Sequence, residues 1–68
     1  MGRRVKSTEL QPGDLVFFDT EGTVPGHVGI VTDPPDFVHA PSAGKRVRID
    51  SVKNIYWSKH FYGARRVE

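Results

Sequence analysis

Short apolar runs separated by turn residues dominate this sequence, and they predict a small β-structure with little helix. Leu15 to Phe18 is a continuous apolar run, which is typical of a strand buried on both sides. Val28 to Val31 and Phe37 to Val38 are rich in residues that favour strands. The expected strands lie near residues 15–19, 27–32, 37–40, 46–49 and 61–67. The pattern therefore predicts a mainly β fold, a small curled antiparallel sheet or SH3-like partial barrel of about five strands.

Turn residues separate the expected strands. Pro12 and Gly13 suit the second and third positions of a type II turn. Asp33 to Asp36 holds two prolines between two aspartates and predicts a tight reversal. Residues 1–9 are polar and basic, and we expect them to be disordered. The remaining residues, 10–68, are expected to form one folded subdomain.

The stretch after the third expected strand alternates basic and apolar residues. This alternation predicts that Val47 and Ile49 face the core while the arginines between them face water. The residues that follow have no period of two. Asp50 or Ser51 is expected to cap a single helical turn at residues 55–57.

Two histidines lie on either side of the predicted reversal, and the strand register decides whether they meet. Side chains alternate faces along a strand, and directly opposite residues share a face. An even reversal would place His39 opposite Ile30, with His27 on the other face. An odd reversal, such as 33–35, would place His39 opposite Gly29, with His27 as a diagonal neighbour on the same face. We favour the odd register, because Gly29 leaves room for an imidazole and a glycine within a strand marks a close approach.

A pair of histidines on neighbouring strands is compatible with three kinds of site. The two rings can act as a base and its orienting partner beside a nucleophile. They can also ligate a metal, although only His60 remains as a third nitrogen ligand and the sequence has no Cys. They can equally be ordinary half-buried histidines. From spacing alone all three interpretations stay open.

Composition narrows the possible partners. The chain has 68 residues, a formal net charge of +2 and no Cys, so we expect one domain without disulfides. This weak charge does not predict nucleic-acid binding, and the basic pairs Lys45-Arg46 and Arg65-Arg66 are interpreted as solvated surface. No apolar run has membrane-spanning length, and Met1 to Glu9 has no apolar segment of a secretory signal. We expect no membrane partner, no metal and no cofactor.

Several segments resemble the NlpC/P60 cysteine peptidases. These segments are Leu10 to Phe18, His27 to Val31 and Phe37 to Pro41, and they occur in the family's order. The tail from Tyr56 to Val67 is similar to the closing strand of that family. The resemblance extends over nearly the whole chain.

The resemblance implies a papain-like enzyme that cuts peptides of bacterial cell walls, commonly between D-γ-glutamyl and diaminopimelyl residues. It also implies an exported or cell-envelope location. His27 matches the general base of the family. His39 matches the polar residue that orients this base. These roles suit the chemistry, since the base must take a thiol proton while its other ring nitrogen is held.

The sequence departs from the family at the nucleophile. In the family, the nucleophilic Cys begins a helix in the half that precedes the sheet, and these 68 residues contain no Cys. Ser42 and Ser51 are the nearest hydroxyls, and neither matches the nucleophile. We therefore expect the base-bearing half of an endopeptidase, inactive alone. It would act on peptidoglycan stem peptides only when a Cys-bearing helical half completes it.

Two other functions remain open at this stage. One is a non-catalytic SH3-like module that binds peptides or cell wall. The other is a structural partner whose exposed sheet face pairs with another chain. The missing helical half would cover one face of the sheet in the family, so we also expect self-association through the uncovered face.

Overall fold

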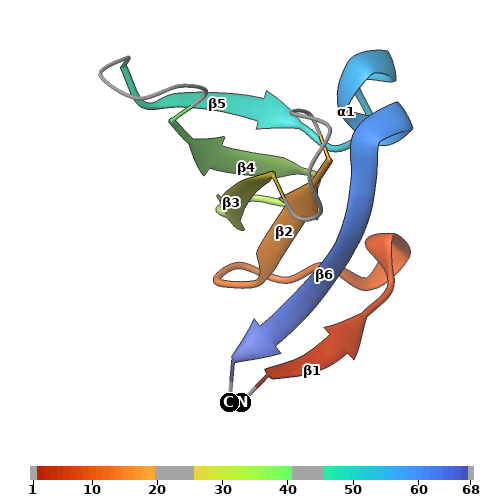
Figure 1. Ribbon diagram of the computed structural model, residues 1–68. Coiled ribbons are helices and arrows are strands. Elements are labelled where there is room, and N and C mark those ends of the chain that lie inside the picture. The colour runs from red at the N-terminus through yellow and green to blue at the C-terminus, as the bar shows by residue number, and fades with distance from the viewer. Residues whose placement is uncertain (1, 20–25, 41–45, 68) are drawn as a thin grey trace.

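The computed structural model describes residues 2–19, 26–40 and 46–67, which form an antiparallel sheet with one short helix (Figure 1). The elements are β1 (Gly2–Val5), η1 (Ser7–Glu9), β2 (Leu15–Phe18), β3 (His27–Val31), β4 (Asp36–His39), β5 (Arg48–Ser51), α1 (Ile55–His60) and β6 (Phe61–Val67). The six strands lie in the order β1-β6-β2-β3-β4-β5, and each neighbouring pair is antiparallel. No helix within the described residues is long and apolar enough to cross a membrane.

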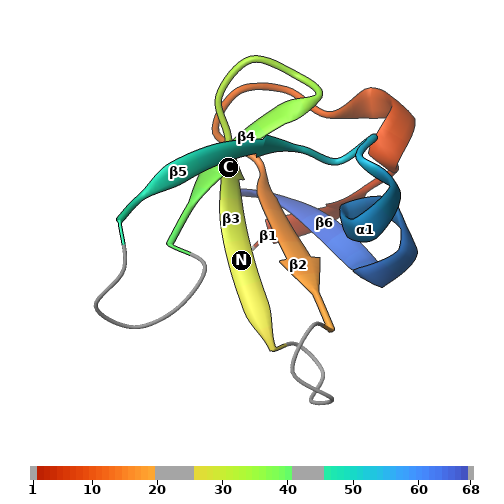
Figure 2. The ribbon, with the colours of Figure 1, turned by 90° about the horizontal axis from the view of Figure 1, so that it is seen from above.

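The predicted mainly β fold is confirmed, with six strands instead of about five. The sheet twists strongly, so that β4 and β5 run across β2 and β3 when the molecule is seen from above (Figure 2). It remains open, because β1 and β5 are edge strands of the linear strand order. The five strands predicted from the sequence are all present, with ends that differ by no more than two residues.

The prediction of a disordered segment at 1–9 is wrong for residues 2–9. This segment forms β1, which pairs with β6 along its whole length, and then η1. Val5 lies opposite Ala64, and both side chains are buried in the core. A single buried apolar residue, Val5, is enough for this edge strand. The two arginines before it interrupt any apolar pattern that would predict a strand from the sequence.

The core lies on the inner face of the curled sheet. It consists of Val5, Val16, Phe18, Val31, Phe37, Val52 and Ala64, with Leu10, Trp57 and Phe61 packed against it. Phe18 and Phe37 are fully buried, and their ring centroids lie 5.0 Å apart. Full burial of a side chain of this kind stabilises the fold by roughly 1.5–3 kcal/mol. These two rings therefore join β2 to β4 beneath β3.

The opposite face of the sheet, which we call the outer face, is apolar and uncovered. Ile30 pairs with Val38, and Val38 pairs with Ile49, so an apolar row crosses β3, β4 and β5. Val28, Ile30 and Ile49 are 49%, 48% and 61% exposed. The prediction that Val47 and Ile49 face the core is wrong, because the inner positions of β5 carry polar side chains. Leu15 and Phe17 of β2 also lie toward this face and are only half-buried.

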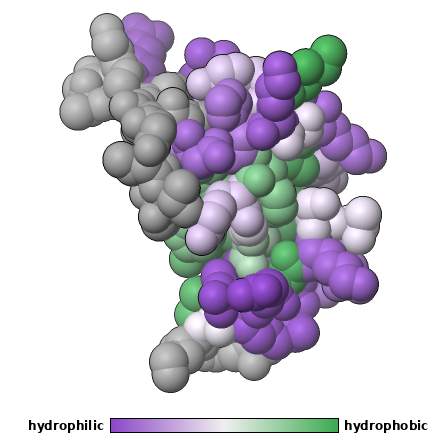
Figure 3. Space-filling view, turned by 45° about the vertical axis from the view of Figure 1, so that its right-hand side comes forward, coloured by the Kyte–Doolittle hydropathy of each residue, from purple (hydrophilic) through white to green (hydrophobic). Residues whose placement is uncertain are grey.

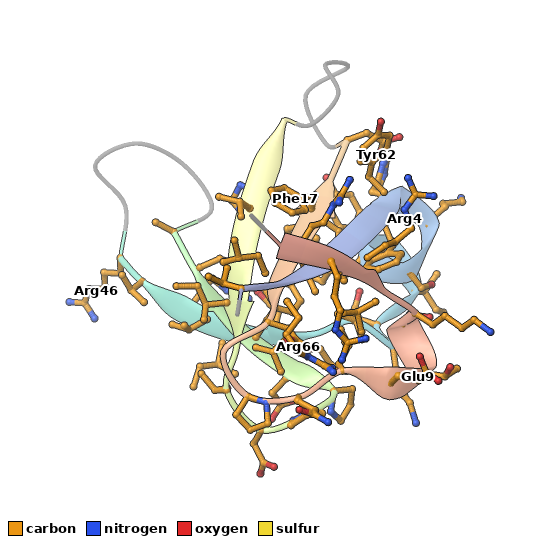
Figure 4. The ribbon with its side chains drawn as sticks, turned by 90° about the horizontal axis from the view of Figure 1, so that it is seen from below. Arg4, Glu9, Phe17, Arg46, Tyr62 and Arg66 are labelled. Carbon is orange, nitrogen blue, oxygen red and sulfur yellow. The ribbon has the colours of Figure 1, made fainter. Side chains whose placement is uncertain are left out.

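Side views of the molecule show the same mixture of apolar and polar surface. In Figure 3, apolar residues form a central band, with hydrophilic residues above and below it. Arg46 projects away from the sheet before β5 (Figure 4), and it is exposed, as the sequence predicts for that basic pair.

The short helix forms where a helical turn is predicted, but its cap is a different residue. The side chain of Asn54 accepts a hydrogen bond from the backbone N–H of Tyr56 at 2.9 Å and caps α1. The predicted caps, Asp50 and Ser51, lie in β5 instead. They belong to β5 because this strand continues two residues beyond its predicted end.

A tight turn leads into β2 and places a carboxylate inside the fold. The backbone N–H of Asp14 donates to the carbonyl of Gln11 at 3.1 Å, and Gly13 has a φ of 93°. This positive φ is the geometry of the third position of a type II turn, as predicted. Asp14 follows the turn and is almost completely buried.

Arg66 of β6 binds the buried carboxylate of Asp14. Its Nε and a terminal nitrogen each donate to one carboxylate oxygen at 2.9 Å, which is a bidentate pair. The same guanidinium donates to the carbonyl of Glu9, and Figure 4 labels both residues. The hydrogen bonds from Arg66 hold the pKa of Asp14 below its usual range, against the opposing effect of burial. Arg66 is therefore a structural ion-pair partner and not solvated surface.

We expect Asp14→Asn to lower stability at neutral pH by about 1.5–3 kcal/mol and to weaken the dependence of stability on acid. The folded-state pKa of Asp14 lies below 3.8, so its ionised form stabilises the fold above that pH. This stabilisation is lost as the pH falls through the lowered folded-state value. Urea unfolding across acidic and neutral pH measures both effects. Asp33→Asn, at an exposed turn position, controls for the loss of one charge. An unchanged acid dependence in Asp14→Asn would contradict the role of the ion pair.

We also expect the isolated chain to be marginally stable or to self-associate through the outer face, since an uncovered apolar sheet face promotes contact between copies. Ile30→Lys should reduce this association. Ile55→Lys is the matched control, because Ile55 is 82% exposed on α1, away from the sheet. Sedimentation velocity at rising concentration is the measurement. A strict monomer with a melting temperature above about 90 °C would count against this expectation.

Candidate functional site

The two histidines predicted to meet do lie together. His27 begins β3 and His39 ends β4. Nε2 of His27 lies 2.6 Å from Nδ1 of His39, within hydrogen-bond distance, and the two rings are nearly perpendicular at 82°. The prediction that both imidazoles lie on one sheet face is confirmed, and they are close enough for a direct hydrogen bond.

The odd register that brings them together is also confirmed. Ile30 lies opposite Val38, and continuing this pairing by one residue places Gly29 opposite His39. The reversal accordingly consists of residues 33–35. A shift of one residue in this pairing would turn one histidine to the other face of the sheet.

Gly29 has a different role from the one predicted. A Cβ at Gly29 would lie 2.5 Å from Cδ2 of Phe37 and 3.3 Å from the carbonyl oxygen of Val38. The space over the glycine is therefore filled by the Phe37 ring and not by an imidazole. The centroid of that ring lies 4.7 Å from the centroid of His39. Gly29 thus supports the site indirectly, because it lets Phe37 pack beside His39.

A carboxylate extends the histidine pair. Nε2 of His39 lies 2.6 Å from Oδ2 of Asp50 on β5. The His39 side chain is 0% exposed and that of Asp50 is 16% exposed. Arg48 approaches the same carboxylate, with its Nε 3.1 Å from Oδ2. The structure thus contains a continuous chain of hydrogen bonds from His27 through His39 to Asp50.

Sequence reasoning missed Asp50, because it assigned this residue to a helix cap. A usable signal existed in the alternation along β5. If Val47 and Ile49 share one face, then Arg48 and Asp50 share the other. That other face is the one that carries His39, which lies directly opposite Arg48 in the β4–β5 pairing.

Aromatic rings enclose the histidine pair on its inner side. The indole of Trp57 stacks on the His27 ring, with centroids 5.6 Å apart and an angle of 24° between planes. It meets the His39 ring edge-on at 4.9 Å. Trp57 also packs against Phe18 at 4.9 Å. Trp57 therefore contacts both the core and the site, while Tyr56 beside it is half exposed.

The third histidine and the candidate hydroxyls stay outside this arrangement. Nδ1 of His60 pairs with Oδ1 of Asp19 at 3.0 Å. The Ser51 hydroxyl accepts a hydrogen bond from the backbone of Lys53 at 3.1 Å. Ser42 lies outside the described residues. Among the described residues, no group of three or more His, Asp and Glu side chains is placed to hold a metal ion.

A shallow hollow has His27, but not His39, in its lining. Phe17, Gly26, His27 and Val28 line a space of about 250 Å³, so Phe17 is a lining residue here and not a core residue. A larger hollow of about 540 Å³ lies elsewhere, between η1, the β3–β4 reversal and α1, and no histidine lines it. The smaller hollow includes Phe17 and Val28 of the outer face, and His27 is the one residue of the pair that borders it.

The fold and the site define a small open sheet that carries a hydrogen-bonded histidine pair, and the comparisons identify its family. The sequence model of the NlpC/P60 family matches residues 1–66. The chain belongs to the NlpC/P60 family.

Individual relatives carry peptidase names. The chain is 46% identical to the probable endopeptidase NlpC of Escherichia coli (strain K12), over 98% of this chain and 44% of that protein. It is 41% identical to the murein DD-endopeptidase MepH of the same organism, over 93% of this chain and 24% of that protein. It is 46% identical to the peptidoglycan DL-endopeptidase CwlO of Bacillus licheniformis, over 96% of this chain and 14% of that protein. The chain therefore spans less than half the length of these relatives.

Solved structures agree with the family and the fold. An NLP/P60 family protein of Staphylococcus aureus, described as similar to lipoprotein, matches with a TM-score of 0.75 and 35% identity. A NlpC/P60 family protein of Bacillus cereus matches with a TM-score of 0.78 and 29% identity. In each case the match covers 97% of this chain and 22% of the other chain.

We expect Gly29→Ala to lower stability by about 1–3 kcal/mol, because the new methyl group would overlap the buried Phe37 ring. Displacement of this ring should also disturb His39. Gly63→Ala is the matched control, since a Cβ at Gly63 meets nothing within 4 Å. Denaturant unfolding and histidine ring NMR shifts measure the two effects. Equal stability of both variants would contradict this role for Gly29.

Proposed function

We propose that this chain is the base-bearing half of a peptidoglycan endopeptidase site, with His27 as general base and His39 as the group that orients it. The observation that carries this proposal is the 2.6 Å contact between Nε2 of His27 and Nδ1 of His39. A base that is held through one ring nitrogen can take a proton on the other. The wall of Trp57 on one side of the pair further limits rotation of the His27 ring.

The nucleophile in this proposal is a Cys thiol from a segment outside these 68 residues, which contain no Cys. His27 removes the thiol proton, and the thiolate attacks the peptide carbonyl. The C–N bond breaks as the imidazolium returns the proton to the leaving amine. Water then releases the acyl group and regenerates the thiol.

The names of two relatives support a substrate class. One is called a murein DD-endopeptidase and another a peptidoglycan DL-endopeptidase, so they differ in the bond. We therefore propose the stem peptide of peptidoglycan as the substrate of the completed site. An exported or envelope location follows from this substrate.

A non-catalytic module that binds peptides or cell wall is the second candidate. Neither candidate takes a Cys from these residues. The two candidates differ in one result. A binding module would retain stem peptides without turnover, even when a Cys-bearing segment is present.

We expect the isolated chain to leave muropeptides intact, and a Cys-bearing helical segment supplied in trans to restore cleavage. His27→Ala should then lower the rate by roughly 10²–10⁴-fold, because the thiol loses its base. His60→Ala is the matched control, since His60 pairs with Asp19 away from the site. Mass analysis of the digested muropeptides is the measurement.

Two outcomes would contradict the proposal. One is cleavage by the isolated chain that survives a thiol-blocking reagent, which would require a different nucleophile. The other is full activity of His27→Ala in the complemented reaction, which would remove His27 from the role of base.

A further inference from the structure

We propose that Asp50 is a positioning residue of this site, which fixes the tautomers of both histidines and so makes Nδ1 of His27 the basic atom. This inference rests on the proposed function, because it assumes that His27 is the base. It adds a third group to the pair and assigns the direction of each hydrogen bond. Asp50 does not touch the reacting atoms itself.

Asp50 sets which atom donates in each hydrogen bond of this series. An ionised carboxylate only accepts hydrogen bonds. Oδ2 of Asp50 lies 2.6 Å from Nε2 of His39, so this nitrogen carries the proton and donates it. A terminal nitrogen of Arg48 donates to Oδ1 of Asp50 at 3.4 Å, and its Nε lies 3.1 Å from Oδ2, so a positive charge lies beside this carboxylate.

The same logic passes through His39 to His27. A neutral imidazole has one N–H, and in His39 this N–H is already on Nε2. Nδ1 of His39 is then an acceptor, so Nε2 of His27 must be the donor in the 2.6 Å contact between the rings. With its proton on Nε2, neutral His27 has its lone pair on Nδ1. The tautomer that His27 requires as a base is thus determined by Asp50, which is two hydrogen bonds away.

The geometry after proton transfer is consistent with this arrangement. When His27 takes a proton on Nδ1, it becomes a cation, and its Nε2–H still donates to His39. His39 is 0% exposed, so water cannot screen the new charge from that side. The carboxylate of Asp50 lies at the far end of the same hydrogen-bond chain and stabilises a positive charge on the pair.

A purely structural role explains Asp50 less well. Its ion pair with Arg48 involves a guanidinium whose side chain is 62% exposed, and exposed pairs of this kind add little stability. The other contact of Asp50 is with a fully buried ring nitrogen, which would otherwise be left without a partner. The carboxylate is therefore placed to act on His39.

The test is the protonation state of each ring nitrogen, measured by nitrogen-15 NMR of the 68-residue chain at neutral pH. In the wild type we expect His27 and His39 each to carry the proton on Nε2. Asp50→Leu and Asp50→Val remove the acceptor, and valine suits a strand position if the leucine variant fails to fold. In either folded variant, His39 should lose its single tautomer, since no carboxylate then holds its proton on Nε2. The nitrogen shifts of both rings should then move toward the average of the two forms.

Arg48→Gln is the control, because it removes the guanidinium but keeps the carboxylate beside His39. It should leave both tautomers unchanged. Backbone amide shifts of Phe18 and Phe37 report whether each variant retains its core. If both rings keep the proton on Nε2 in the folded Asp50 variants, the proposed role of Asp50 is wrong.

The proposed function has a separate test in the complemented reaction. Full activity of His27→Ala there would remove His27 from the role of base, whatever the spectra show for Asp50 and His39. If instead wild-type His27 carries its proton on Nδ1, the tautomer that we infer is wrong. The failure of the proposed function and the failure of this inference can therefore be told apart.

Discussion

The pairing of β3 with β4 is the constraint on which the site depends. Side chains on a strand alternate between faces, so only an odd reversal places both histidines on the inner face. The same register sets Phe37 over Gly29, where any side chain at position 29 would collide with the ring. A single pairing thus fixes the contact between the rings and the packing beneath them. The packing in turn stabilises the register. A shift of one residue in the pairing would turn Ile30 or Val38 to the inner face in place of Phe37.

The polar groups of the site are buried among aromatic rings, and this is stable only because they bind one another. Both ring nitrogens of His39 have partners at 2.6 Å. Within the described residues, no buried side-chain nitrogen or oxygen is without a hydrogen-bond partner. An isolated polar group in such a place would cost stability, whereas a satisfied chain gives a rigid, specific geometry. The rigidity of the pair therefore comes from β5 as much as from the two strands that carry the histidines.

The strands and the histidine contact could be predicted from the sequence, because apolar runs, turn residues and one glycine mark them directly. The argument from Gly29 gave the correct register but named the wrong neighbour. The ring of Phe37, and not that of His39, fills the space beside Gly29. β1 was not predictable, because paired arginines conceal a strand that buries only Val5. Asp50 was hidden by a different effect. Apolar alternation shows which residues share a face, but it does not show which face is covered, and in β5 the apolar face is the uncovered one.

The residues that contact one another in the site are close in sequence, whereas the residues that join the two ends of the chain are far apart in sequence. His27 and His39 are 12 residues apart, and His39 and Asp50 are 11 apart. Asp14 and Arg66 are separated by 52 residues, and β1 and β6 bring both ends of the chain together (Figure 1). Closing a longer loop costs more chain entropy and slows folding. The hairpins that carry the catalytic candidates can therefore form before the ends meet. Fraying of the β1–β6 edge can then occur without taking the histidines apart.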